Sequence, residues 1–277
     1  MSRIPRVLSI AGTDPTGGAG VQADLKSVSA NGGYGMCVVT ALVAQNTQGV
    51  RSVHVPPVSF LREQLDAVSD DVTIDAVKIG MLSSEAVIST VSEWLRRIRP
   101  PIVVLDPVMV ATSGDRLLDQ PAEAALLGLL SLVDIVTPNL PELAVLAQGP
   151  VARTWPEALA QAEGVSRDHA VIVLVKGGHL AGDESPDALV DASGSLSGCR
   201  TVAELPGERI ATLNTHGTGC SLSSALATQQ VLLGDWEQAL LVSKQWITHS
   251  LRHADELNVG RGRGPINHFA TLWAAAG

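Results

Sequence analysis

Short apolar runs alternate with longer stretches of helical periodicity along the chain. Each apolar run is rich in Val, Ile and Leu and stops at a polar residue or glycine, which predicts a buried strand. Strands are predicted in this way over residues 6–11, 34–43, 74–79, 102–105, 133–136 and 170–176. The periodic stretches between them predict helices over 20–31, 59–69 and 84–98. This alternation is typical of right-handed βαβ units, and hence of an α/β fold with a mostly parallel sheet between helical layers.

The second half of the chain continues this pattern with one interruption. Thr154–Glu157 has the form of a capping box and opens a predicted helix. Residues 187–212 are more polar and rich in turn residues, so we expect hairpin strands there, at one edge of the sheet. The turn Gly217–Cys220 opens a long helix, and another helix begins near Asp235. Because no repeat, linker or low-complexity segment divides the chain, residues 1–277 are expected to form a single domain.

Composition narrows the class of protein. The chain is 45% apolar but only 3% aromatic, so its core must consist mainly of Val, Leu, Ile and Ala, which suits a covered parallel sheet. The net charge of −9, without a long basic cluster, argues against nucleic-acid binding. No apolar run approaches the length of a membrane span, and the first residues do not resemble a signal peptide. With three scattered cysteines and no CxxC motif, the expected location is the reducing cytoplasm.

Glycine and polar residues collect directly after the predicted strands. They include Gly12–Asp14, Gly80–Met81, Asp106–Pro107, Asn139 and Lys176–Gly178. In open α/β sheets, ligands bind at the carboxyl ends of the strands. The sequence therefore predicts a ligand site at that edge of the sheet.

Two glycine-rich loops are candidates for contact with a ligand. Within the first, Gly12–Gly20, residues 18–23 match a relaxed dinucleotide fingerprint, but no acidic residue follows at 38–48 to hold a ribose. That loop is either a tight turn before a helix or a backbone surface against a substrate ring. The second, Asn214–Cys220 (NTHGTGC), precedes an apolar helix. Its amides would form an anion hole suited to a phosphoryl group, or the turn is only a glycine-rich helix entry.

Three polar side chains each allow two interpretations. Lys176 ends a predicted strand, where it either extends into solvent or binds a phosphate. Asn139 and Glu142 share one face at a helix start, where they either orient Mg²⁺ through water or simply cap the helix.

Seven segments, in register over nearly the whole chain, resemble the hydroxymethylpyrimidine/phosphomethylpyrimidine kinases of the ribokinase-like superfamily. They are SIAGTDPTGGAGVQADLK (9–26), VTALVAQNTQGV (39–50), VKIGML (77–82), VLDPVMVATSGDRLL (104–118), TPNLPE (137–142), VKGGH (175–179) and NTHGTGC (214–220). The tail GRGRGPINHF (260–269) resembles the family's usual ending. The resemblance implies one α/β domain, commonly a homodimer, that uses ATP and Mg²⁺. The implied reaction phosphorylates 4-amino-5-hydroxymethyl-2-methylpyrimidine and then its monophosphate, for thiamin synthesis.

The resemblance also implies roles for individual residues. Gln45 matches the family's substrate glutamine, whose amide offers a donor and an acceptor to an aminopyrimidine edge. Further positions of the substrate pocket match Gly12, Asp24, Met81 and Val108. Positions near Mg²⁺ and the phosphates match Asn139 and Glu142, assigned to the metal, and Asp106, assigned to the nucleotide. The phosphate-stabilising lysine matches Lys176, and a further lysine near the nucleotide matches Lys244. In the anion-hole turn, Gly217 and Gly219 are assigned to catalysis and Thr218 to the nucleotide.

Cys220 ends that turn where sugar kinases of the superfamily carry a catalytic aspartate. A thiol at a helix N-terminus has a lowered pKa, so Cys220 is a candidate base or hydrogen-bonding group. Alternatively, it is a small buried thiol that places the substrate and never ionises. Since phosphoryl transfer depends mainly on positioning and charge stabilisation, both alternatives stay open, with Cys220 assigned to the catalytic group.

Three other functions compete with the pyrimidine kinase. A pyridoxal kinase of the same fold is favoured by Cys220, which could add to an aldehyde. The hypothesis of an NAD-dependent oxidoreductase is based on the dinucleotide fingerprint at 18–23. The third hypothesis is a nucleotide-binding regulator without catalytic activity, and the retained polar residues of the site argue against it. Val110–Arg116 is our candidate for a mobile segment over the site.

Overall fold

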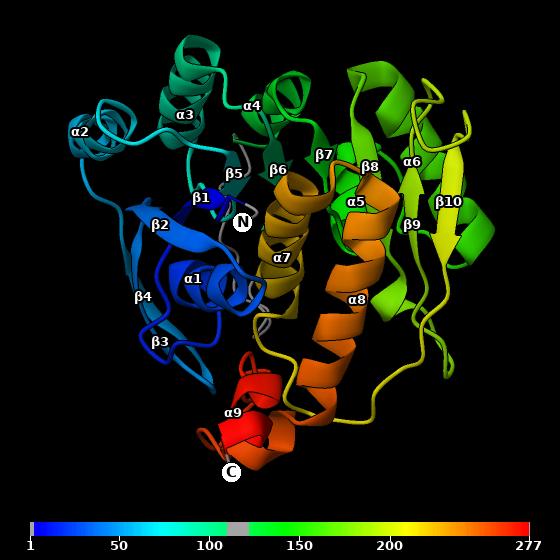
Figure 1. Ribbon diagram of the computed structural model, residues 1–277. Coiled ribbons are helices and arrows are strands. Elements are labelled where there is room, and N and C mark those ends of the chain that lie inside the picture. Colours follow the sequence, from blue (N-terminus) through cyan, green and yellow to red (C-terminus); the bar gives the residue numbers. More distant parts are fainter. Residues whose placement is uncertain (1–2, 110–121, 277) are drawn as a thin grey trace.

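The computed structural model describes residues 3–109 and 122–276, so the candidate segment Val110–Arg116 lies outside the described residues. Its main sheet has eight strands in the order β10-β9-β8-β7-β6-β5-β1-β2 (Figure 1). The strands are β1 (Arg6–Ala11), β2 (Tyr34–Val39), β5 (Ala76–Ile79), β6 (Val103–Leu105), β7 (Ile135–Val136), β8 (Ile172–Lys176), β9 (Asp187–Val190) and β10 (Val202–Leu205). All neighbours from β2 to β8 pair in parallel, whereas β8–β9 and β9–β10 are antiparallel. The mostly parallel sheet and its edge hairpin, both predicted from the sequence, are confirmed.

Helices cover both faces of this sheet. One face carries α1 (Gly20–Ala30), α7 (Thr218–Leu233) and α8 (Trp236–Arg252), with α7 and α8 in front of the strands in Figure 1. The other face carries α2 (Val58–Ser69), α3 (Glu85–Ile98), α4 (Ala122–Leu129), α5 (Leu140–Leu146) and α6 (Trp155–His169). The short helix α9 (Ala270–Ala276) follows the C-terminal tail.

The sheet separates two hydrophobic cores, one under each helical layer, and successive side chains of a strand point alternately into one core and the other. Val104 packs with the α1–α7–α8 layer, whereas its neighbours Val103 and Leu105 pack with the opposite layer. Such strands are apolar throughout because both of their faces are buried, which is why they appear in the sequence as continuous Val, Ile and Leu runs.

A separate two-stranded ribbon was not predicted. Residues 34–43, predicted as one strand, divide into β2 and β3 (Leu42–Asn46), and β3 pairs antiparallel with β4 (Gly49–His54). The chain leaves the main sheet at Thr40, whose amide bonds the Ala11 carbonyl at 3.0 Å and whose hydroxyl donates to the Met81 carbonyl at 2.6 Å. These bonds direct the ribbon over the carboxyl ends of β1 and β5.

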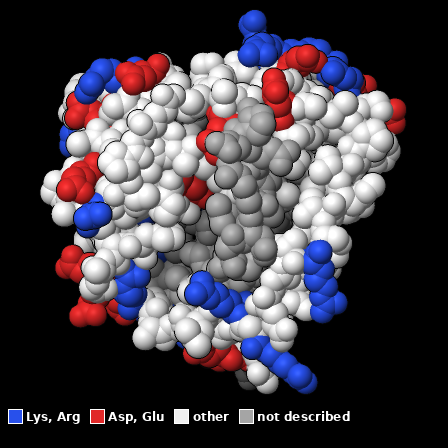
Figure 2. All heavy atoms as spheres, turned by 180° about the vertical axis from the view of Figure 1, so that it is seen from behind, with Lys and Arg blue, Asp and Glu red and all other residues white. Residues whose placement is uncertain are grey.

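The surface is acidic overall, as the net charge of −9 requires. On the face seen in Figure 2, Lys and Arg side chains alternate with Asp and Glu around the rim, without a continuous basic area among the described residues. Within residues 3–109 and 122–276, no helix combines the length and apolar character that a membrane crossing requires.

Candidate active site

A cavity of about 800 Å³ opens at the carboxyl ends of the parallel strands. Residues that follow β1, β5, β6, β7 and β8 form its floor, the ribbon β3–β4 borders it, and the start of α7 and one face of α8 complete it. Its lining contains every predicted site residue except one: Gly12, Gln45, Met81, Asp106, Val108, Asn139, Glu142, Lys176, Gly217, Thr218, Gly219, Cys220 and Lys244. The strand-end rule therefore located the cavity from sequence.

The start of α7 packs directly against the first glycine loop. Gly217 has a φ of +77°, and a Cβ atom on it would lie 1.7 Å from the Gly18 carbonyl oxygen. No side chain among the described residues caps α7, and its first amide, that of Thr218, donates to the Thr215 carbonyl at 3.3 Å. The next two amides, those of Gly219 and Cys220, belong to the first turn, whose amides have no acceptor within the helix and are therefore candidates for contact with a ligand. Together with the helix dipole they form an anion-binding surface.

A buried ion pair lies beneath this turn. Lys176 Nζ is 3.0 Å from Asp106 Oδ1, and Thr137 donates to the same oxygen at 3.1 Å. A Cβ on Gly219 would be 3.4 Å from Lys176 Nζ and 3.5 Å from Asp106 Oδ2. The cation and the helix start thus converge on one region of the cavity, although they are more than 40 residues apart in the sequence.

Mutual charge sets the ionisation of this pair. Burial alone would lower the pKa of Lys176, but the carboxylates of Asp106 and Glu142 raise it. Burial alone would raise the pKa of Asp106, but the charges of Lys176 and Lys78 lower it. Both groups therefore remain charged at neutral pH, so the ammonium of Lys176 is available to an anionic ligand although Asp106 offsets part of its charge.

Asn139 and Glu142 form the capping box of α5. Asn139 Oδ1 accepts from the Glu142 amide, and Glu142 Oε2 accepts from the Asn139 amide, both at 2.9 Å. Burial raises the pKa of Glu142 to about 7, despite the nearby charge of Lys176. Both side chains also line the cavity, so capping and metal binding do not exclude each other. Two carboxylates, from Asp106 and Glu142, suit Mg²⁺ that completes its shell with phosphate oxygens and water.

The opposite end of the cavity carries an apolar cluster and the side-chain amide of Gln45. Met81 and Val43 pack together with Val108 at its wall, and a Cβ on Gly12 would be 3.0 Å from the Met81 sulfur. The pairing register of β3 and β4 shifts next to Gln45, and such irregularities re-aim side chains. Gln45 is partly exposed to the cavity. This end fits a flat ring with polar atoms on its edge.

Asp24 is the predicted site residue that the structure does not bring to the cavity. Its carboxylate is fully buried and accepts hydrogen bonds from Ser9 at 2.6 Å, Lys78 at 2.8 Å and Ser224 at 2.8 Å. Burial alone would lower the pKa of Lys78, but the Asp24 carboxylate raises it. The pair joins α1 and α7 to β1 and β5 behind the cavity wall. Lys78 was missed because its apolar neighbours in β5 gave no signal of a buried charge.

Cys220 lies beside this buried charge and remains a thiol. Burial raises the pKa of Cys220 to about 11, although the charge of Lys78 opposes the rise. The expected lowering by the helix N-terminus is outweighed by burial. Of the two roles considered from sequence, a neutral thiol that places the substrate agrees better with this environment.

Asp14 and His216 tie the two glycine loops together, and the sequence analysis placed both in those loops without giving either a role. Asp14 Oδ2 is 2.8 Å from His216 Nε2 and accepts from the amides of Gly18 and Ala19 at 3.0 and 2.8 Å. Burial alone would raise the pKa of the Asp14 carboxyl, but hydrogen bonds from His216 and Thr16 lower it to about 2. An aspartate followed by Pro-Thr-Gly was the only sequence signal, that of a turn.

We expect Asp14→Asn to destabilise the protein in a pH-dependent way. Because the pKa of Asp14 is about 2 when folded and 3.8 when unfolded, its contribution is present above pH 4 and is lost as the pH falls towards 2. The variant should lose about 1–2 kcal/mol at pH 7, and its difference from wild type should narrow between pH 4 and 2. Urea unfolding at several pH values measures this, with the exposed Asp71→Asn as control. A difference independent of pH would contradict it.

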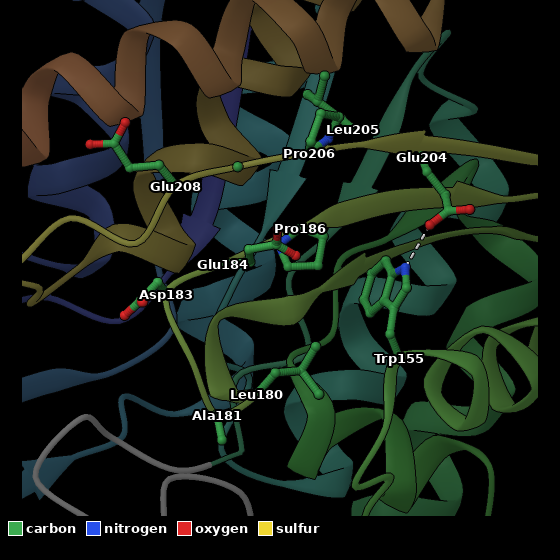
Figure 3. A pocket seen from close by; sticks show the side chains of 11 residues that line it. Trp155, Leu180, Ala181, Asp183, Glu184, Pro186, Glu204, Leu205, Pro206 and Glu208 are labelled. Atoms are coloured by element: carbon green, nitrogen blue, oxygen red, sulfur yellow. Dashed lines mark hydrogen bonds between the residues drawn. The ribbon is translucent and has the colours of Figure 1, made fainter.

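A second hollow, of about 790 Å³, lies on the other side of the segment 180–186. Figure 3 shows Trp155 directed at Glu204, and the indole Nε1 donates to Glu204 Oε2 at 2.6 Å. Its remaining lining includes the acidic side chains of Asp183, Glu184 and Glu208. A hollow lined by carboxylates without a lysine repels polyphosphate, so the lysine-containing cavity is the candidate active site.

Comparisons with known proteins identify the family and the fold of this chain. The family model described as phosphomethylpyrimidine kinase matches residues 14–267. The hydroxymethylpyrimidine/phosphomethylpyrimidine kinase of Escherichia coli K12 is 47% identical over 274 residues, which cover 99% of this chain and 100% of that enzyme. A thiamine biosynthesis multifunctional protein of Corynebacterium glutamicum is 57% identical over 95% of this chain, which spans only 34% of that protein.

Among solved structures, an ADP complex of Bacillus subtilis pyridoxal kinase superimposes with a TM-score of 0.87 at 30% identity. The match covers 98% of this chain and 99% of that one. An oxidoreductase, considered for the fingerprint at 18–23, is therefore not supported, since a kinase fold accounts for the loop.

Proposed function

This chain belongs to the phosphomethylpyrimidine kinase family, and we propose that it transfers the γ-phosphoryl group of ATP to 4-amino-5-hydroxymethyl-2-methylpyrimidine and then to its monophosphate. One observation carries the proposal. A single cavity joins a ring-sized apolar end bearing Gln45 to the anion-binding start of α7, which lies above the Lys176–Asp106 pair.

In the first step, the hydroxymethyl oxygen attacks the γ-phosphorus, the bond to the β–γ bridging oxygen breaks and ADP leaves with the electron pair, while the hydroxyl proton passes to solvent. In the second step, an oxygen of the substrate phosphate attacks in the same way. Charge on the transferred group would be stabilised by the amides of Gly219 and Cys220 and by Lys176. The Gln45 amide would orient the aminopyrimidine edge, with Met81 and Val108 against the ring.

Asn139 and Glu142 would hold Mg²⁺, with Asp106 beside them near the nucleotide phosphates; when bound, the ion would neutralise charge on those phosphates. The nucleoside would lie at the far end of the cavity, against Ile247 and Leu251 of α8. Lys244 lines that end, where its ammonium is 2.6 Å from Asp187 Oδ2. We further propose that residues 1–277 form one domain that acts as a homodimer in the cytoplasm, supported by the continuous sheet and the family resemblance.

Pyridoxal phosphorylation is the second candidate, because the pyridoxal kinase of B. subtilis matches the whole fold. ATP consumption measured side by side with the pyrimidine alcohol, its monophosphate and pyridoxal tests both functions. We expect the highest kcat/KM with the two pyrimidines. A preference for pyridoxal would reverse the ranking, and no turnover with any of the three would refute the proposal.

We expect Cys220 to react slowly with iodoacetamide near neutral pH. Its pKa of about 11 leaves little thiolate, whereas Cys199 is exposed to solvent. Mass spectrometry of alkylation at pH 7.5 should show modification of Cys199 well before Cys220, and the Cys220 rate should rise continuously up to pH 10. Rapid labelling of Cys220 at pH 7.5 would instead support a thiolate base.

A further inference from the structure

Four cations line the candidate active site, and three of them are already engaged. Lys176 pairs with Asp106 at 3.0 Å, and Lys244 pairs with Asp187 at 2.6 Å. The Arg209 guanidinium donates at 2.7–3.1 Å to four backbone carbonyls, those of Gly178, Leu180, Gly182 and Glu184. The fourth cation, Arg263, is exposed, and its guanidinium has no partner among the described residues.

Arg263 lies on a segment that connects the two ends of the site. On the ring side, its amide donates to the Thr47 carbonyl at 3.0 Å, and the Gly262 amide donates to the Thr47 hydroxyl at 3.1 Å. Thr47 is two residues from Gln45. On the phosphoryl side, the His216 amide donates to the Gly264 carbonyl at 3.0 Å, next to Gly217.

The backbone of this segment is held closely in place. A Cβ on Gly262 would be 2.0 Å from the Thr47 carbonyl oxygen, and one on Gly264 would be 2.4 Å from Asn214 Oδ1. The Gly264 amide also donates to Asn214 Oδ1 at 2.8 Å. Arg263 is thus anchored between the ribbon that carries Gln45 and the turn that precedes α7.

A monophosphate substrate presents a charge problem that the alcohol does not. Its phosphate must lie between the ring and the γ-phosphoryl group, so two strongly anionic groups approach each other. The ammonium of Lys176 already pairs with Asp106 and would bind the transferred phosphoryl group. A guanidinium binds phosphate oxygens through paired, charge-assisted hydrogen bonds. Arg263 lines the cavity, lies on the segment between its two ends, and has no side-chain partner within residues 3–109 and 122–276.

We propose that Arg263 binds the phosphate of the monophosphate substrate and thereby sets the preference for the second phosphorylation; this rests on the proposed function. In that step, a substrate phosphate oxygen forms a bond to the γ-phosphorus, the bond to the bridging oxygen breaks, and ADP leaves with its electron pair. Arg263 keeps its proton and makes no covalent bond.

The test compares both substrates in wild type and Arg263→Gln. We expect the ratio of kcat/KM for the monophosphate to that for the alcohol to fall about 10- to 100-fold. The Kd of the monophosphate, measured by calorimetry, should rise by a factor similar to the fall in this ratio. Reaction time courses of the variant that begin with the alcohol should accumulate monophosphate. Arg263→Lys should give an intermediate ratio, because it keeps the charge but loses the paired donors.

Arg261→Gln is the matched control, since it removes a cation from the same segment outside the cavity lining. Its ratio should equal that of wild type. A ratio within twofold of wild type in Arg263→Gln, or an equal fall in Arg261→Gln, would overturn the assignment of Arg263 but leave the kinase function standing. A wild-type protein that phosphorylates neither pyrimidine would refute the function itself.

Discussion

Replacing Lys176 by alanine should lower kcat for phosphoryl transfer about 10²- to 10³-fold, with a much smaller change in KM for the pyrimidine. Lys176 Nζ lies near both Asp106 and Gly219, where we propose that the transferred phosphoryl group is bound. An interaction made mainly in the transition state affects kcat rather than substrate affinity. Steady-state kinetics with the alcohol at saturating ATP and Mg²⁺ measure the effect.

A folding defect would also lower the measured activity, and Lys176→Ala risks one because it leaves the buried carboxylate of Asp106 without its partner. Lys176→Gln is therefore the second variant, since it keeps a donor towards Asp106 but has no charge. Lys244→Ala is the matched control at the nucleoside end, and we expect it mainly to raise KM for ATP. If Lys176→Ala and Lys176→Gln fold normally and keep near wild-type kcat, Lys176 does not stabilise the transferred phosphoryl group.

Gly217→Ala should remove at least about 99% of activity and lower the free energy of unfolding by about 2–4 kcal/mol. Its Cβ would lie 1.7 Å from the Gly18 carbonyl oxygen, and its φ of +77° is unfavourable for alanine. The atom that it meets is backbone, so no side chain can rotate to make room. The two glycine loops must separate, which moves the first amides of α7 away from the cavity.

Gly234→Ala provides the control at the other end of α7. Gly234 also has a positive φ, +67°, but apart from its immediate backbone neighbours no described atom lies within 4 Å of its Cβ position. The Gly234→Ala variant should lower the free energy of unfolding by about 1 kcal/mol and leave turnover intact. Activity assays and urea unfolding of Gly217→Ala and Gly234→Ala measure these differences. Equal behaviour of the two would show that close approach of the loops is unimportant for the reaction.

The central strands of the main sheet were predictable because their side chains are buried on both faces and are mostly apolar. The observed strands β5, β6, β7 and β8 fall inside the predicted ranges, and each begins one or two residues later than predicted. The ribbon β3–β4 was not predictable in the same way. Residues 34–43 have no break in their strand-like pattern, and the hydrogen bonds of Thr40 to Ala11 and Met81 decide where the sheet ends.

Some site residues were likewise predictable from the sequence, whereas the position of others depended on tertiary packing. Lys176, Asp106 and Asn139 follow strands, so their meeting at one edge of the sheet was expected from chain order alone. Asp24 lies one helical turn past Gly20, and whether it faces the cavity or the interior depends on how α1 packs. It packs inward, where Lys78 neutralises it.

Chain order and hydrophobic pattern determined the α/β class and the sheet edge where the cavity opens, and the glycine-rich turn before α7 marked its start as a candidate anion site. These follow from local rules, since strand burial, turn chemistry and helix dipoles act over a few residues. Tertiary structure alone decided that Asp14 meets His216, that Asp24 and Lys78 form a buried pair, and that Arg263 reaches the site. Those contacts join residues between 54 and more than 200 positions apart, and their energies depend on burial and charge that only the packed chain creates.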